Sequence, residues 1–118
     1  MLPLEVRKYL YDIRQACQRL TEFTAGKTFG DYTSDFMLRA AVERPFEIIG
    51  EALNQMLKRE PSLTSKISAH RRIIAFRNRL IHGYAEIDNE VVWGVLEVNL
   101  PRLSHDVDAL LEKEKDIR

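Results

Sequence analysis

The chain of 118 residues has one cysteine, four prolines, five glycines and no long hydrophobic run. A single cysteine, Cys17, excludes an internal disulfide framework and is typical of a reducing compartment. Because Cys17 lies at helical spacing between Ile13 and Leu20, we interpret it as a small core residue. No stretch reaches the roughly 18 apolar residues of a membrane span, and residues 1–10 lack the apolar run of a secretory signal. We therefore expect a soluble, cytoplasmic protein without membrane contact.

The chain also lacks a net charge, because 18 Lys and Arg residues balance 18 Asp and Glu residues. No whole-molecule electric field therefore steers it toward nucleic acid or an anionic membrane, and any attraction to an anion must be local. The length is that of one domain, which we place at residues 1–118. A domain of this size often shares its core with a partner subunit.

Apolar residues recur three and four positions apart along most of the chain, and no stretch alternates for long enough to predict a strand. Gly26 can end the first helix, and Pro61 ends the second because the residue before a proline leaves the helical region. We expect an all-α fold, an antiparallel bundle of four main helices with a possible fifth short helical turn at 28–35. The four main helices are expected at about 3–24, 34–59, 68–81 and 89–115.

Two prolines, Pro45 and Pro101, fall inside predicted helices. Each removes a backbone donor and should bend or break its helix, at a cost of about 3 kcal/mol if the helix were otherwise straight. Because the apolar register continues across both positions, we favour a kink over an additional loop.

One segment is locally basic. Between Pro61 and Ala85 there is no Asp or Glu, whereas Lys66, Arg71, Arg72, Arg77 and Arg79 all lie there, together with His70 and His82. A solvated helix face is the simplest interpretation. Such a face usually mixes both signs of charge, however, and the planar fork of arginine suits bidentate contacts to phosphate. We therefore keep Lys66, Arg71 and Arg72 as candidate RNA-binding residues.

The stretch RNRLIHGY at 77–84 combines a histidine with a guanidinium. A histidine can accept or release a proton at cytosolic pH, and a guanidinium can neutralise charge that develops on phosphorus, so the pair could cleave RNA without a metal. On a continuous helix Arg77 and His82 point roughly 140° apart. They converge only if the helix ends near Ile81, where Gly83 is a ready terminator, or if a second chain completes the site. Taken alone, His82 could be a histidine favoured by the helix dipole.

A second polar cluster lies in EIIGEALN at 47–54. Glu47 and Glu51 share a helix face and repel each other unless a cation lies between them. Gly50 costs up to about 1 kcal/mol relative to alanine in a helix, which is tolerable where another helix approaches closely. We predict that the basic helix packs over this face, with Glu47 or Glu51 orienting Arg77 or Arg79. A solvent-facing glutamate pair is the alternative.

Together these motifs resemble a known family. RNRLIHGY resembles the R-x4-6-H-x-Y signature of HepT-like toxins, the DUF86 group of the HEPN superfamily, and EIIGEA at 47–52 resembles that family's second recurring stretch. The two stretches lie about 25 residues apart, and the length and helical layout also match. This combination is far more specific than an arginine and a histidine alone.

The resemblance implies a metal-independent endoribonuclease without a cofactor, which acts as the toxin of a HEPN/MNT toxin–antitoxin pair. It further implies a homodimer in which the signatures of both protomers meet in one cleft. Arg77 and His82 would form the catalytic pair, with Asn78 fixing the site or the RNA. Tyr84 would be the residue that a minimal nucleotidyltransferase (MNT) antitoxin adenylylates, which places charge and bulk where RNA phosphate should bind.

Aromatic residues give a weaker indication of the dimer. Core burial remains the simplest interpretation of each one, but their number exceeds what one small bundle buries comfortably, and an interface could use the excess. These residues are Tyr9, Tyr11, Phe23, Phe29, Phe36 and Trp93. The competing functional class is a non-enzymatic HEPN module that binds a nucleotide or a partner and cuts nothing.

Overall fold

The computed structural model describes residues 1–82 and 87–116, and it confirms the all-α fold. No strand occurs among the described residues. Within these two ranges lie six α-helices: α1 (Leu4–Thr24), α2 (Phe29–Ser34), α3 (Phe36–Arg59), α4 (His70–Ile81), α5 (Asn89–Gly94) and α6 (Leu100–Asp116). A 3₁₀ turn at Pro61–Lys66 precedes α4, and a π-helical turn at Val95–Asn99 joins α5 to α6.

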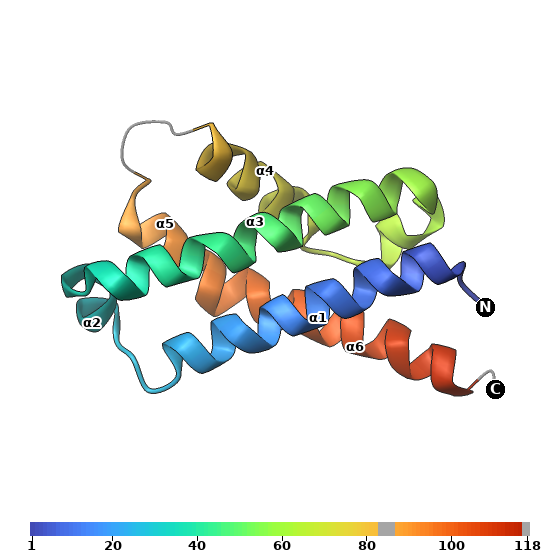
Figure 1. The fold of residues 1–118 in the computed structure, drawn as a ribbon, viewed down its shortest axis with the longest axis horizontal. Coiled ribbons are helices and arrows are strands. Elements are labelled where there is room, and N and C mark those ends of the chain that lie inside the picture. Colours follow the sequence, from blue (N-terminus) through green and yellow to red (C-terminus); the bar gives the residue numbers. More distant parts are fainter. Residues whose placement is uncertain (83–86, 117–118) are drawn as a thin grey trace.

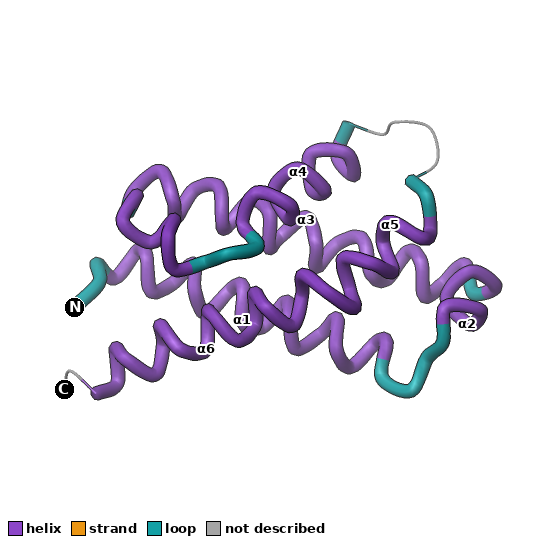
Figure 2. Tube along the Cα trace, turned by 180° about the vertical axis from the view of Figure 1, so that it is seen from behind, coloured by secondary structure: helices purple, strands orange, loops and turns teal. Residues whose placement is uncertain are grey.

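The long helices form two layers. In Figure 1, α1 and α3 lie toward the viewer, and α4 packs along the side of α3 that faces away from α1. Figure 2 shows from behind that α5 and α6 form one long rod across α1 and α3. Leu10, Leu53 and Leu103 from α1, α3 and α6 are all fully buried in the core between the layers. The start of α1 and the end of α6 lie side by side, and the Leu2 backbone N–H donates to Glu114 Oε1 at 3.0 Å.

The first helix follows its apolar spacing. Val6, Leu10, Ile13, Cys17 and Leu20 are all buried on one face of α1. Gly26 follows the helix end with a φ of 72°, the left-handed region that glycine adopts without strain. Burial raises the pKa of the Cys17 thiol to about 12, so this thiol stays protonated and is a core residue, as expected.

The second long helix begins later than expected because the chain first forms a separate short helix. Thr28 and Asp31 make a reciprocal capping box that starts α2, and the Asp35 carboxylate then accepts from the Leu38 N–H at 3.1 Å to start α3. The possible turn expected at 28–35 is therefore a true helix. Residue 34 belongs to α2, and α3 begins at Phe36.

The two internal prolines differ in how the helix around them is built. Pro45 is buried inside α3, which continues on both sides of it. Before Pro101 the last helix changes to the π-helical turn, in which the Leu100 N–H bonds the Val95 carbonyl five residues back. A π-bulge inside a helix is one of the recognised causes of a distortion. The irregularity predicted at Pro101 is therefore present, and it lies just before the proline.

The start of α4 is held by the last helix. Ser68 donates its backbone N–H and its hydroxyl to Asp106 Oδ2 at 3.1 and 3.2 Å. The helix itself begins at His70, two residues later than predicted, and it ends at Ile81 as predicted.

Several apolar side chains remain on the surface. Phe36 and Met37 at the start of α3 are 73% and 80% exposed, and Tyr11, Phe23 and Phe29 are also exposed. The expectation that one bundle does not bury all of its aromatic residues is met for these three and for Phe36. No helix among the described residues is long and apolar enough to cross a membrane.

Candidate functional site

The basic helix α4 packs against α3 through its apolar face. Ile73 and Phe76 of α4 are buried, and the Phe76 ring meets the Phe46 ring of α3 edge-on, with 5.0 Å between centroids. This contact brings the second half of α4 over the EIIGEALN stretch of α3. The packing predicted between the two motifs is therefore present.

Gly50 is the point where the two helices approach most closely. A Cβ atom built on Gly50 would overlap the Cβ and Cγ atoms of Arg77. The side chain of Arg77 therefore lies directly on the backbone of α3, where no residue other than glycine fits without a shift. This agrees with the prediction that Gly50 permits a close helix approach.

Arg77 makes an ion pair with Glu51 across the same contact. The Arg77 side chain is only 18% exposed, whereas that of Glu51 is 48% exposed. The second Glu51 oxygen accepts from Gln55 Nε2 at 3.2 Å, so the carboxylate is itself held in place. Arg77 Nε is buried without a hydrogen-bond partner among the described atoms, as are Arg7 Nε and Glu114 Oε2 elsewhere in the molecule.

Glu47 pairs with neither Arg77 nor Arg79, the two partners that the sequence suggested for it. It accepts from Arg44 Nη1 at 3.3 Å, within its own helix. Arg79 is exposed and pairs with no acidic side chain among the described residues. Of the four combinations left open by the sequence, the structure contains the one between Glu51 and Arg77.

These groups line a groove of about 280 Å³ between α1, α3 and α4. Tyr9, Ile48 and Ile81 form its apolar walls, and Glu47, Glu51 and Arg77 form its charged side. The sequence analysis did not single out Arg44, which also lies in this groove. Arg44 and Glu47 are three residues apart and so share a helix face, and this spacing could have predicted their ion pair from the sequence.

Asn78 extends the contact toward the end of the helix. Its Oδ1 accepts from Arg77 Nη1 at 3.0 Å, whereas the α3 carboxylate accepts from the other terminal nitrogen, Nη2. Asn78 and His82 are four residues apart and therefore share a face of α4. Glu51, Arg77 and Asn78 thus form a continuous series of contacts that ends on the helix face carrying His82.

His82 closes α4. Its backbone N–H bonds the Asn78 carbonyl at 3.2 Å, and its side chain is exposed. The helix end near Ile81 was one of the two conditions under which Arg77 and His82 could approach each other, and this condition is met. Tyr84, the predicted modification site, lies outside the described residues.

The remaining basic residues form an exposed surface on α4 and the turn before it. Lys66, Arg71, Arg72 and Arg79 are all exposed, and none forms an ion pair with a described acidic residue. Arg71 lies on the same helix face as Asn78 and His82, at spacings of seven and eleven residues. Their positive charge is therefore available to an anion.

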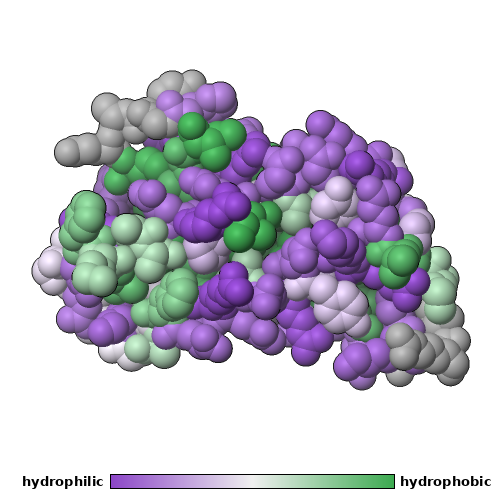
Figure 3. Space-filling view, viewed as in Figure 1, coloured by the Kyte–Doolittle hydropathy of each residue, from purple (hydrophilic) through white to green (hydrophobic). Residues whose placement is uncertain are grey.

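Figure 3 shows the hydropathy of one face of the molecule in the view of Figure 1. Hydrophilic side chains cover most of it, and apolar surface gathers near the C-terminal end of α4 and over α2 with the start of α3. The exposed apolar residues of these elements include Ile81 at the end of α4, which is 45% exposed, and Phe36 and Met37 at the start of α3. Among the described residues, no cluster of three or more His, Cys, Asp or Glu side chains could hold a metal ion.

Comparison with known proteins identifies the family to which the chain belongs. Residues 13–110 match the family model described as "Ribonuclease HepT-like". The chain belongs to the HepT-like ribonuclease family. That match includes both the Gly50–Glu51 stretch and the whole of α4, so the contact described above lies within the HepT-like domain.

Individual HepT-like relatives match over nearly their full length. The chain is 35% identical to "Putative RNase TTE0752" of Caldanaerobacter subterraneus subsp. tengcongensis, over 92% of this chain and 96% of that protein. It is 33% identical to "Probable ribonuclease HepT" of Thermococcus cleftensis, over 88% and 94% of the two chains. It is 31% identical to "Putative RNase MJ1380" of Methanocaldococcus jannaschii, over the same two shares. No solved structure matches the chain.

The Gly50 contact can be tested by a matched pair of substitutions. Gly50→Ala should destabilise the protein by about 1–3 kcal/mol, because the new methyl group overlaps Arg77. Gly94→Ala should stabilise it by about 0.5–1 kcal/mol, because a Cβ there meets nothing within 4 Å and alanine is the better helix former. Denaturant unfolding of both variants checks the prediction, and equal effects at the two glycines would contradict the close contact.

Proposed function

We propose that the protein is a metal-independent endoribonuclease in which Arg77 and His82 cleave RNA. The observation that carries this proposal is the ion pair between Glu51 and Arg77, reinforced by Gly50, in a chain of the HepT-like ribonuclease family. Glu51 and Asn78 hold the two terminal nitrogens of the guanidinium, so its direction is set before a substrate arrives. Preorganised charge of this kind is the largest single contribution to many enzymatic rate enhancements.

In the proposed reaction the ribose 2′-oxygen attacks the adjacent phosphorus. His82 takes the 2′-hydroxyl proton as general base, or donates a proton to the departing 5′-oxygen as general acid. Arg77 stabilises the charge that gathers on the pentacoordinate phosphorus. The bond from phosphorus to the 5′-oxygen then breaks, which leaves a 2′,3′-cyclic phosphate on one fragment and a 5′-hydroxyl on the other. No water molecule is consumed in this step.

Substrate binding is assigned to the exposed basic residues. Lys66, Arg71, Arg72 and Arg79 would contact phosphates on either side of the cut, because all four are exposed and none pairs with a described acidic residue. The chain carries no net charge, so these local contacts must supply the electrostatic attraction.

We further propose that the active species is a homodimer with the α4 ends of two protomers in one cleft. Residues five apart on a regular helix point roughly 140° apart, so a second copy would bring a histidine to each Arg77 and a guanidinium to each His82. The exposed Ile81 beside His82 is consistent with such an interface, since apolar residues gather at the core of subunit contacts.

The catalytic roles can be tested by RNA cleavage in EDTA. His82→Ala should lower the cleavage rate about 10²–10⁴-fold, the range that general acid–base catalysis supplies. His105→Ala is the matched control, because His105 is an exposed histidine on α6, a helix that contributes no residue to the groove that holds Arg77. It should cleave like the wild type.

Undiminished cleavage by His82→Ala, or a strict requirement for a divalent metal, would contradict the mechanism. If the wild type binds RNA and its products never appear, the alternative of a non-catalytic binding module is favoured instead.

We also propose that the protein is the toxin of a toxin–antitoxin pair whose minimal nucleotidyltransferase partner adenylylates Tyr84. This assignment depends on the resemblance of RNRLIHGY to the HepT-like signature. A phosphate attached two residues from His82 would place negative charge where the RNA phosphate should bind, and so would silence the enzyme.

Intact mass spectrometry checks the modification. After incubation with ATP and the nucleotidyltransferase encoded by the neighbouring gene, the wild-type protein should gain AMP and lose its RNA-cleaving activity. Tyr84→Phe should gain no AMP and keep cleaving in the presence of the partner. Tyr11→Phe, at an exposed tyrosine on α1 outside the groove that holds Arg77, serves as control and should be modified like the wild type. Equal modification of Tyr84→Phe would show that another residue is the acceptor.

A further inference from the structure

A second hollow lies on the other side of the contact between α3 and α4. It has a volume of about 620 Å³ and is bounded by α2, α3, α4 and the start of α5. Phe76 and Leu80 of α4 line it, whereas Arg77 and Ile81 line the groove that holds the proposed catalytic arginine. One helix, about 10 Å across, therefore separates the two sites.

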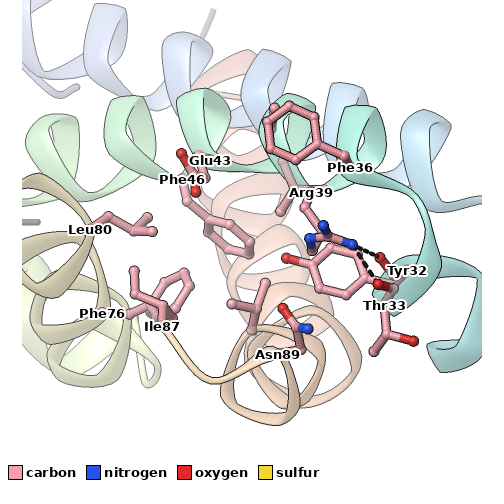
Figure 4. Close-up of a pocket in the computed structure, with 13 residues that line it drawn as sticks. Tyr32, Thr33, Phe36, Arg39, Glu43, Phe46, Phe76, Leu80, Ile87 and Asn89 are labelled. Atoms are coloured by element: carbon pink, nitrogen blue, oxygen red, sulfur yellow. Dashed lines mark hydrogen bonds between the residues drawn. The ribbon is translucent and has the colours of Figure 1, made fainter. Parts of the chain in front are cut away.

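The floor of this hollow is aromatic and apolar. The rings of Tyr32, Phe46 and Phe76 lie beneath the hollow and are almost completely buried, so its accessible apolar surface comes from less buried lining residues such as Phe36, Leu80 and Ile87. Figure 4 shows these rings around the cavity, with Leu80 and Ile87 closing one side. A ligand with a flat apolar face can therefore contact the exposed Phe36 ring and the half-buried Leu80 and Ile87, whereas a fully hydrated ion cannot use such surface.

At the edge of the hollow a guanidinium and an exposed ring form a fixed pair. Arg39 Nη1 donates to the Tyr32 and Thr33 carbonyls at the end of α2, as the dashed lines in Figure 4 mark. The Arg39 guanidinium lies 5.8 Å from the centroid of the Phe36 ring, which is 73% exposed. Both an exposed aromatic ring and a guanidinium plane are surfaces on which nucleic-acid bases stack.

Besides Thr33 and Arg39, three further polar side chains line the space, those of Tyr32, Glu43 and Asn89. Glu43 lies one helical turn after Arg39 and forms no ion pair with a described residue. The Tyr32 ring and the Asn89 carboxamide turn toward the middle of the hollow in Figure 4. Burial, helped by the nearby Glu43 carboxylate, raises the pKa of Tyr32 to about 12, so its hydroxyl keeps its proton and can donate.

This combination matches one base better than the others. The pairing edge of guanine carries two adjacent N–H donors, which suit the two oxygens of a carboxylate, beside one carbonyl acceptor, which suits a hydroxyl or amide donor. Adenine and cytosine offer one amino group at that edge, and uracil offers one N–H between two acceptors. A carboxylate facing the edge therefore favours guanine.

We propose that this hollow holds a guanine base of the RNA substrate, stacked on Phe36 and Arg39 and read by Glu43. The inference deepens the ribonuclease proposed above and rests on it for the identity of the ligand as RNA. A strand that crosses the C-terminal end of α4 would place one base in the hollow and a neighbouring phosphate near His82. The hollow then sets where the enzyme cuts.

Binding of uncleavable RNA tests the proposal without relying on catalysis. The probes are the 2′-O-methyl trinucleotides UGU, UAU, UCU and UUU, which have no 2′-hydroxyl proton and cannot be cut. Calorimetry with the full-length wild-type chain should show UGU binding about tenfold or more tightly than the other three, the discrimination expected of one bidentate base contact.

Two variants separate base reading from stacking. Glu43→Gln should remove the preference for UGU, because the amide presents a donor to the guanine donors. Phe36→Ala should weaken all four probes alike. Glu97→Gln, an exposed glutamate in the π-helical turn, is the matched control and should keep the preference. Equal thermal melting of the variants checks that each is folded.

Equal binding of the four probes, no binding of any, or an unchanged preference in Glu43→Gln would overturn the base site. These results are distinguishable from failure of the ribonuclease proposal. A protein that cuts RNA but binds all four probes equally lacks the base site alone, whereas one that prefers UGU through Glu43 but cuts nothing lacks only the catalysis.

Discussion

The contact of Arg77 with Gly50 and Glu51 is the constraint on which the rest of the molecule depends. The arginine stem occupies the space that any side chain at position 50 would need, and its guanidinium pairs with the next residue of α3. The contact therefore fixes how closely α4 approaches α3. Because α4 is only 12 residues long, its C-terminal end and His82 are placed by the same contact.

This arrangement separates two kinds of positive charge. Arg77 is largely buried and held by Glu51 and Asn78, so it is suited to one defined position on a reacting phosphate. Arg71, Arg72 and Arg79 are exposed on the same helix and pair with no described acidic residue, so they can follow a flexible strand. In the proposed function the hollow beyond Phe76 would add a surface for a base. Catalysis, attraction and base recognition would then each have a separate place around α4.

Much of the fold could be predicted from the sequence, because the spacing of apolar residues and the terminators Gly26 and Pro61 are local signals. The role of Gly50 could also be predicted, since a glycine inside a helix is costly and is tolerated where a second helix approaches closely. The sequence could not predict that Arg77 pairs with Glu51 and not with Glu47. Both glutamates share one helix face, and the angle and position at which α4 crosses α3 determine which of them meets Arg77. The π-helical turn and the hollow beyond Phe76 depend on packing between residues far apart in the sequence.

A double-mutant cycle tests the central claim, that Glu51 acts on the reaction by holding Arg77. The measured quantity is kcat/KM for RNA cleavage by the wild type, Glu51→Gln, Arg77→Ala and the double variant. Loss of a charge-assisted contact should make Glu51→Gln about tenfold or more slower than the wild type. In the Arg77→Ala background the same change should have almost no effect. An equal loss in both backgrounds would contradict the account.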